Sequence, residues 1–501
     1  WPFAEECQKH EYLNDTASDK MEWKCTVCPK NSYCVQGHPP RTMNGFWKAP
    51  WYDEIIDLTE SNKAPEPRYL CMEKEACLGA YKTSNSSIIL IEEGCAQNYT
   101  GPLCAACTRG SYKQAASFRC IGCFQDASLS FLFIFFVVAA TLSVIIGFTL
   151  ATVADGGEAS AVDVIILKIA VNSGIISAGA SAFPLAWPPV VVTMFQMYAV
   201  ASASAIGDSL SADCVLRESD MKPVQAWALT LAIISPCVVF LWIVLFGVMR
   251  FVSGKVKYLR VHLPVAVIVT LTLAHPVITK SAVKLMACRT IAGRRFLDAD
   301  FNISCDGPMY VVWVKAVAIP MIILFTFGVP FAYALAMYRH VLNKTLHDHR
   351  DIYGFFFSGF RKEIWWFELW NTLRKSLFTI AAVLFAPAGV RMQTWGALSL
   401  LLFFLAVFSV TKPYEQDYLN RLERNALSIN IVTLLFGLGL FTNSQAGEQE
   451  STLFAMCITI SIVFLNVAFV LNVLQTLYKY SQYCKCKKEN KEEISTENKE
   501  K

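Results

Sequence analysis

The chain has 501 residues, of which 54% are hydrophobic and 17% charged, and its mean hydropathy is +0.40. The formal net charge of +4 is too small to indicate nucleic-acid binding. Such a composition is typical of a bundle of membrane helices with one polar domain, so we expect a polytopic protein in contact with the lipid bilayer.

The first 124 residues hold 11 of the 18 cysteines and three N-x-S/T sequons, at Asn14, Asn85 and Asn98. Dense cysteine is typical of a small domain that cannot bury a large core, and it favours disulfides over a zinc site despite the C-x-x-C pairs. The chain begins at Trp1 with no apolar leader, which we interpret as a mature form whose signal peptide has been removed. The N-terminus is therefore expected outside the cytosol.

A short cysteine pattern lies at the end of this region. The run from Gly94 to Tyr112 resembles EGF-like and ephrin-receptor-like modules. The resemblance implies an extracellular, disulfide-bonded domain and names no ligand. The cysteines that we expect to be bonded here are Cys95, Cys104, Cys107, Cys120 and Cys123.

Nine apolar runs follow, each near the roughly 20 residues that a membrane helix needs. They cover residues 129–153, a run from 162, and then 227–252, 261–285, 310–338, 366–386, 394–411, 426–442 and 453–478. Prolines between Phe183 and Pro189 break the second run, and we expect residues 188–206 to be re-entrant or interfacial. The expected fold is an all-α membrane bundle (125–480) with a small-β, irregular, disulfide-rich ectodomain (1–124) and a disordered cytosolic tail (481–501).

Basic residues predict the orientation. Four clusters share one side of the membrane if the helices alternate, and the positive-inside rule makes that side cytosolic; they lie at 250–260, 339–362, 412–424 and 479–488. Cysteine parity then places Cys214 outside, bonded to the odd ectodomain cysteine, and Cys288 and Cys305 are expected to bond across an outer loop with a sequon at Asn302. The expected location is the plasma membrane, a ciliary membrane or another surface membrane.

The sequence contains no recognisable catalytic motif, so we expect a protein that is not an enzyme and has no cofactor or metal site. Charged residues at membrane depth are functional hypotheses by default. For Arg374 and Lys375 we predict an internal pair with Glu368 or Glu423. Lys168 and Lys315 are compatible with a cation path only if they pair with carboxylates or point into another helix seam.

Two of the last runs carry polar stripes with two open interpretations. The residues either join helices to one another or line a hydrated ion path, with a hinge at Gly437 and Gly439 and Glu368 at the cytosolic mouth. The candidate path residues are Glu368, Asn430, Thr433, Asn466 and Asn472.

Three motifs carry a second resemblance. The W-W-F-E-L-W-N-x-x-R-K sequence at 365–375, K-P-Y at 412–414 and N-x-x-E at 420–423 resemble protist and fungal TRP-like multi-pass proteins. The resemblance implies calcium-permeable cation transport, although a pore loop is not recognisable. The alternatives are a receptor or anchor, whose ectodomain binds an extracellular ligand, matrix or surface appendage, and a transporter of a small or lipidic solute. Cations, an extracellular protein and further copies of the chain are the expected partners.

Overall fold

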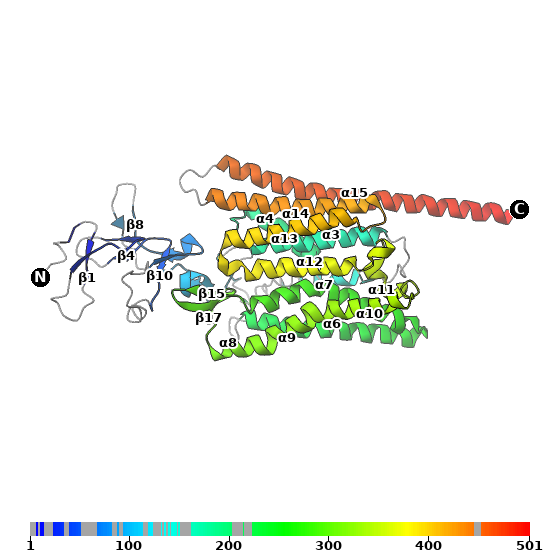
Figure 1. The fold of residues 1–501 in the computed structure, drawn as a ribbon, viewed down its shortest axis with the longest axis horizontal. Coiled ribbons are helices and arrows are strands. Elements are labelled where there is room, and N and C mark those ends of the chain that lie inside the picture. Colours follow the sequence, from blue (N-terminus) through cyan, green and yellow to red (C-terminus); the bar gives the residue numbers. More distant parts are fainter. Residues whose placement is uncertain are drawn as a thin grey trace. The chain divides into compact units, whose positions relative to one another are not determined.

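The computed structural model divides the chain into two compact units (Figure 1). The head comprises Trp1–Phe131, Ser211–Pro223 and Cys288–Val311, and the bundle comprises Leu132–Leu210, Val224–Ala287 and Val312–Lys501. The described residues are 7–8, 11–14, 24–34, 40–51, 68–82, 88–89, 94–113, 119–123, 132, 135–136, 139–140, 142–147, 149–150, 162–202, 214, 223–444 and 452–500.

Short antiparallel strand pairs form the described part of the head. The pairs are β1 (Glu11–Asn14) with β2 (Lys24–Val27), β3 (Ser32–Tyr33) with β4 (Arg41–Thr42), β5 (Phe46–Lys48) with β6 (Arg68–Leu70), β7 (Cys77–Leu78) with β10 (Gly94–Cys95), β8 (Tyr81–Lys82) with β9 (Ile88–Ile89), β11 (Tyr99–Thr100) with β12 (Ala106–Cys107), and β13 (Ser111–Lys113) with β14 (Cys120–Gly122). Isolated two-stranded pairs are marginal in water, so these strands depend on cross-links.

Disulfides provide those cross-links. The pairs are Cys7–Cys25, Cys28–Cys34, Cys71–Cys77, Cys95–Cys104, Cys107–Cys120, Cys123–Cys214 and Cys288–Cys305. Cys214 is thus bonded to the last cysteine of the N-terminal region. The head is a disulfide-rich region of small strands, which indicates an extracellular domain.

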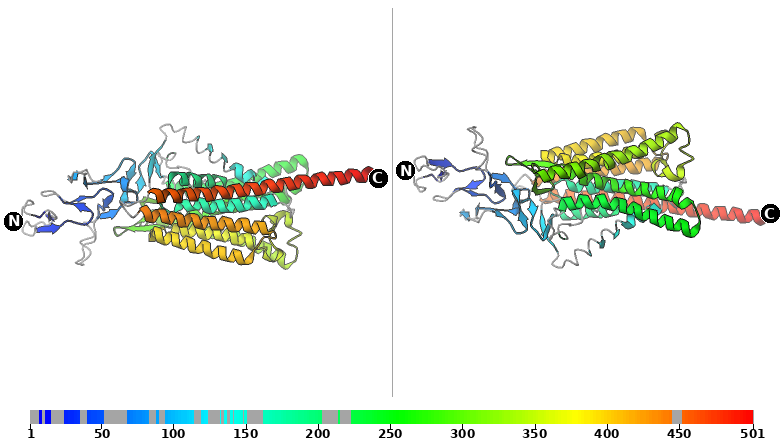
Figure 2. Two further views of the ribbon diagram at one scale, coloured as in Figure 1. Left: turned by 90° about the horizontal axis from the view of Figure 1, so that it is seen from above. Right: turned by 90° about the horizontal axis from the view of Figure 1, so that it is seen from below.

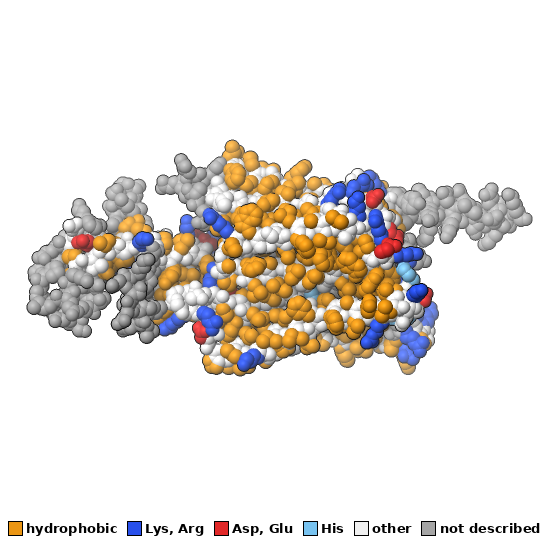
Figure 3. Space-filling model, viewed as in Figure 1, with side chains coloured by type: hydrophobic (Ala, Val, Ile, Leu, Met, Phe, Trp, Pro, Cys, Tyr) orange, Lys and Arg blue, Asp and Glu red, His pale blue; other side chains and the backbone are white. Residues whose placement is uncertain are grey.

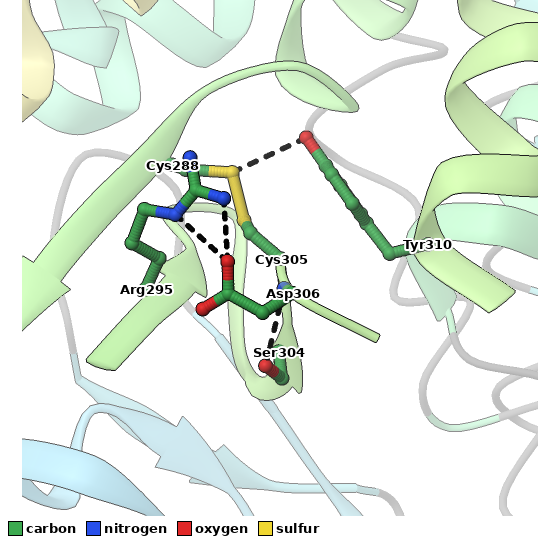
Figure 4. The surroundings of a disulfide bond; sticks show 6 residues. All are labelled: Cys288, Arg295, Ser304, Cys305, Asp306 and Tyr310. Atoms are coloured by element: carbon green, nitrogen blue, oxygen red, sulfur yellow. Dashed lines mark hydrogen bonds and ion pairs between the residues drawn. A yellow bond between two sulfur atoms is a disulfide. The ribbon is translucent and has the colours of Figure 1, made fainter. Parts of the chain in front are cut away.

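A loop from between two bundle helices also belongs to the head. It folds into a three-stranded sheet of β15 (Cys288–Ile291), β16 (Arg294–Leu297) and β17 (Asp300–Ser304). Figure 4 shows its disulfide, where the Tyr310 hydroxyl donates to Cys288 Sγ at 3.2 Å and Arg295 Nε donates to Asp306 Oδ1 at 2.8 Å. Trp51 Nε1 donates to the Ala292 carbonyl at 2.9 Å, so the sheet is fastened to the N-terminal strands.

The expected glycosylation sites lie in different settings. Asn302 is exposed on β17, and Asn98 is partly buried in a turn with φ of 72°. Asn14 is described only in its backbone, and Asn85 lies outside the described residues. Glycosylation at all four positions therefore stays a prediction.

Helices make up the bundle (Figure 2). They are α3 (Val162–Gly179), α4 (Pro189–Ala201), α6 (Pro223–Ser253), α7 (Leu263–Lys284), α8 (Pro308–Trp313), α9 (Ile319–Met321), α10 (Val329–Leu342), α11 (Arg350–Phe357), α12 (Phe367–Leu384), α13 (Val390–Thr411), α14 (Asp417–Ser444) and α15 (Thr452–Glu500). Helix α12 packs against α3, α7 and α13, and α14 packs against α3, α13 and α15. In Figure 3 hydrophobic side chains cover the visible sides of these helices, and Lys and Arg gather near their ends.

Seven helices among the described residues are long and apolar enough to cross a membrane. They are Val162–Ala182, Pro236–Ser253, Tyr258–Lys284, Pro308–Leu342, Val390–Thr411, Asp417–Ser444 and Thr452–Tyr480. The expected count of nine is not confirmed. The run 129–153 lies largely outside the described residues, and the 18-residue α12 is less apolar because it carries three charged side chains. Within 188–206, the 13-residue α4 is about 20 Å long, short of the roughly 30 Å hydrocarbon core.

Three π-helical segments accompany prolines within the long helices. Tyr258–His262, Val314–Ala318 and Ile322–Gly328 end two residues before Pro264, Pro320 and Pro330, respectively. Proline has no N–H and crowds the carbonyl four residues earlier, and a wider turn relieves that crowding. At one of these places, the Thr326 carbonyl four residues before Pro330, a side chain from another helix donates a hydrogen bond.

The backbone of the C-terminal tail is helical. It continues α15 to Glu500, and the disorder expected over 481–501 stays a prediction. Lysine and glutamate are strong helix formers, and a tail rich in both extends a helix that the bundle has already nucleated.

Candidate functional site: a buried ionic network

Five charged side chains are buried among the described residues of the bundle, if histidine is left aside. They are Lys168 on α3, Glu368, Arg374 and Lys375 on α12, and Glu423 on α14. Burying an ion costs several kcal/mol unless it is paired and hydrogen-bonded. Such a cluster inside a membrane bundle is the first candidate for a functional site.

The spacing on α12 explains how the charges come together. Glu368, Asn371, Arg374 and Lys375 recur at helical intervals of three or four residues, so they share one face. All four are buried, while Leu373 is 39% exposed. Helix α12 therefore turns its polar face toward its neighbours, the reverse of an amphipathic helix in water.

The Lys168 ammonium contacts a carboxylate, a carbonyl and two aromatic rings. Its Nζ lies 3.0 Å from Glu368 Oε2 and donates to the Phe355 carbonyl at 2.7 Å. The rings of Phe355 and Phe360 lie 4.7 and 5.3 Å from the same nitrogen. Lys168 thus pairs with a carboxylate, which is one of the two conditions set for it by the sequence, and it joins α3, α11 and α12.

The other two cations differ from each other. Arg374 Nη2 donates to Glu423 Oε1 at 2.7 Å, which confirms the predicted internal pair. Lys375 Nζ donates to Asn172 Oδ1 at 2.9 Å, and no carboxylate oxygen of a described residue lies within 4.0 Å of that nitrogen. Lys375 is thus a buried ammonium held by an amide rather than by an acid.

The motifs singled out by the sequence converge on this network. Phe360 pairs with Tyr414 in an isolated antiparallel bridge, and their rings lie 4.8 Å apart. Asn420 accepts from the Tyr414 N–H at 3.1 Å and donates to the Tyr414 carbonyl at 3.0 Å, one turn before Glu423. Burial raises the pKa of Tyr414 well above its ordinary value, and Glu423 and Glu368 raise it further, so its hydroxyl stays neutral. Residues of the K-P-Y and N-x-x-E motifs thus form one end of the network.

The candidate path residues are engaged between helices. Ser177 Oγ donates to Asn430 Oδ1 at 2.7 Å, and Asn430 Nδ2 donates to Ser173 Oγ at 3.1 Å. Asn466 Nδ2 donates to Thr433 Oγ1 at 3.2 Å. These bonds join α14 to α3 and to α15, which favours the helix-joining interpretation of the polar stripe.

The remaining candidates lie apart from one another. Glu368 is 1% exposed and paired, and Asn472 is exposed on α15. A Cβ on Gly437 would lie only 2.2 Å from Trp187 Cη2, whereas one on Gly439 would meet Ile458 Cδ1 at 3.3 Å. Gly437 thus serves a close approach between α14 and the 183–188 turn.

Sequence reasoning missed two participants. Asn172 lies one turn after Lys168 on α3, and that polar pair in an apolar run was a usable signal. His275 Nε2 donates to the Thr326 carbonyl at 3.1 Å. That carbonyl lies four residues before Pro330, which supplies no N–H for it, so the proline itself marks where another helix must donate.

The described residues contain no group of three or more His, Cys, Asp or Glu that could hold a metal ion.

Comparison with known proteins gives one relevant similarity. No protein-family model and no solved structure matches the chain. Cysteine repeat modular protein A of Toxoplasma gondii is 26% identical over 227 residues, which cover 42% of this chain and 7% of that protein. The chain thus corresponds to a small part of the relative's length. Similarity at this level does not establish a family, but it accords with the cysteine-rich head.

Proposed function

We propose that the chain is a multi-pass surface receptor, whose extracellular head binds a ligand or protein partner and whose bundle relays the event to the cytosolic side. On this proposal the N-terminus is extracellular, the C-terminus is cytosolic, and the protein is not an enzyme. The proposal begins from a disulfide-rich head attached to apolar helices. The relative's name, which speaks of cysteine repeats and modules, agrees with the cysteine-rich head.

One observation carries the proposal: the chain passes between head and bundle five times, after residues 131, 210, 223, 287 and 311. A single passage suffices to anchor an extracellular domain. The additional passages arise because two loops between bundle helices, Ser211–Pro223 and Cys288–Val311, belong to the head. Cys123–Cys214 and Cys288–Cys305 hold these loops covalently.

The connection continues into the buried network. Helix α7 ends at Lys284, shortly before Cys288, and it packs along α12. Helix α12 carries three of the five buried charges. A displacement of the β15–β17 sheet therefore has a direct route, through the backbone of α7, to the helix that organises the network.

The alternative is the TRP-like cation channel that the sequence motifs imply. A cation path needs polar groups free to replace an ion's hydration, yet the amides of Asn430 and Asn466 are used between helices. The network also holds three cations against two carboxylates, which would repel a permeating cation. These observations favour the receptor over the channel.

The test is hydrogen–deuterium exchange of the purified full chain in nanodiscs, with and without a Fab fragment that binds the head. We expect Fab binding to change exchange in α7 and α12, with a Fab against the C-terminal tail as the control. The Cys288→Ser/Cys305→Ser variant should still bind the head Fab, but Fab binding should change hydrogen–deuterium exchange in α7 and α12 less than it does in wild type. Unchanged exchange in the bundle would leave the head as an anchor and refute the relay. Cation current from wild type in planar bilayers would support the channel instead.

A further inference from the structure

We propose that the buried network binds one small monovalent inorganic anion, chloride, beside the hydrogen-bonded Lys375 and Asn172. The inference concerns the bundle alone and does not depend on the receptor proposal. It rests on the charge balance of the network and on hydrogen-bond donors that have no acceptor.

The charge balance comes first. Lys168, Arg374 and Lys375 face Glu368 and Glu423, and the other four charges all lie within electrostatic reach of Lys375. One positive charge is left in excess. The other acids and bases of the helices packed around the network, histidine left aside, are not buried; they are Asp163 on α3, Lys280 and Lys284 on α7, Arg350 and Asp351 on α11, Arg391 on α13, and Asp417, Arg421 and Arg424 on α14.

Each carboxylate is paired through one oxygen, and neither lies within 4.0 Å of Lys375 Nζ, so we assign the excess to Lys375; Glu368 Oε1 and Glu423 Oε2 have no hydrogen-bond partner in the described structure. Glu368 pairs with Lys168 at 3.0 Å and also accepts from Asn371 at 3.1 Å through the same oxygen. Glu423 pairs with Arg374 at 2.7 Å. An uncompensated buried ion costs several kcal/mol, and a bound anion removes that cost.

The donor inventory agrees with the charge balance. The Lys375 ammonium has three N–H groups, and the Asn172 oxygen is its one hydrogen-bond acceptor among the described residues. The Asn172 amide nitrogen is buried without a partner in the described structure, as is Arg374 Nε. The Asn172 nitrogen belongs to the same amide whose oxygen accepts from Lys375, so both unpartnered donors are in the neighbourhood of this hydrogen bond.

The chemistry selects the class of anion. A single excess charge is balanced by a monovalent anion, whereas phosphate or sulfate would overcompensate it. Protein interiors are close-packed, and a spherical halide needs the least space and accepts from any direction. A carboxylate would bring a hydrocarbon part that the charge balance does not require.

The test uses the purified full chain in nanodiscs. Binding of radioactive chloride is expected at one ion per chain, and the unfolding midpoint is expected to rise with chloride over gluconate at equal ionic strength, because a ligand that binds only the folded state stabilises it. Asn172→Asp supplies a fixed negative charge beside Lys375. We expect this variant to lose chloride binding and to match, in gluconate, the midpoint of wild type in chloride.

Controls make the outcomes distinct. Asn343→Asp adds the same charge at an exposed site and should keep wild-type chloride binding. Should Asn172→Asp not fold, Lys375→Met removes the excess charge and should likewise abolish binding. Wild type that binds no chloride, as it would if Lys375 were an uncharged amine, overturns the proposal. Binding that survives both substitutions overturns it too.

Discussion

Replacing Glu423 by glutamine removes the carboxylate from the Arg374–Glu423 pair and leaves the guanidinium buried. The two atoms are 2.7 Å apart, and both side chains are 2% exposed. At an effective dielectric constant of about 20, unit charges at this distance attract by roughly 6 kcal/mol, much of which offsets their desolvation. Deleting one partner of a buried pair costs about 3–5 kcal/mol. At about 2 °C per kcal/mol, the midpoint should fall by roughly 6–10 °C.

The assay is thermal unfolding in nanodiscs, followed by intrinsic tryptophan fluorescence. Glu415→Gln is the matched control, since Glu415 is exposed and close in sequence, and it should leave the midpoint within about 1 °C. The Arg374→Met/Glu423→Leu double variant should recover most of the loss, because apolar residues of similar volume replace buried pairs at little cost. A loss below about 1 kcal/mol in Glu423→Gln, or a double variant as unstable as the single one, would refute the reasoning.

Two further outcomes are expected. Gly437→Ala should destabilise the bundle by about 1–3 kcal/mol in the same assay, since its Cβ would lie 2.2 Å from Trp187. Gly439→Ala should be tolerated, because only the end of an isoleucine side chain must move. Equal effects of the two substitutions would contradict this reasoning. Asn302 should carry a glycan that peptide mapping after glycosidase treatment detects, while Asn343 should not, because the basic residues around it predict the cytosolic side; a glycan on Asn343 would invert the bundle.

The helical fold class was predictable because an apolar run of membrane length is a local signal. The break between α3 and α4 was equally visible, since closely spaced prolines end a helix. The predicted count of nine stays unconfirmed, because the run 129–153 lies largely outside the described residues and α12 carries charged side chains, whose partners lie on α3 and α14. A sequence alone does not say whether a charge at membrane depth ends a span or finds a partner inside one.

The disulfide bonding of the head was predictable from the sequence, whereas the packing of its segments against one another was not. Cysteine parity placed Cys214 with the N-terminal cysteines, and the structure bonds it to Cys123. The hydrogen bond from Trp51 to the Ala292 carbonyl in the β15–β17 sheet had no local signal in the sequence, because it joins residues 241 positions apart.

The site was predictable in part. The pair of Arg374 with an internal carboxylate followed from the need to compensate a buried charge. The contact of Lys375 with Asn172 did not, because it depends on which faces of α3 and α12 meet. The sequence left two interpretations of the polar residues open, an ion path and the joining of helices. The hydrogen bonds of Asn430 and Asn466 favour the joining of helices.

The disulfide from Cys123 to Cys214 also sets an order for biosynthesis. Its cysteines are 91 residues apart, so at roughly 5–20 residues per second Cys123 waits about 5–20 s as a thiol after it is made. The β15–β17 sheet, which Trp51 holds, is made later still. The head therefore cannot finish folding before α3, α4, α6 and α7 have been synthesised, and a secreted fragment that stops at residue 124 would expose an unpaired Cys123, free to form disulfide-linked dimers or to engage oxidoreductases of the secretory pathway.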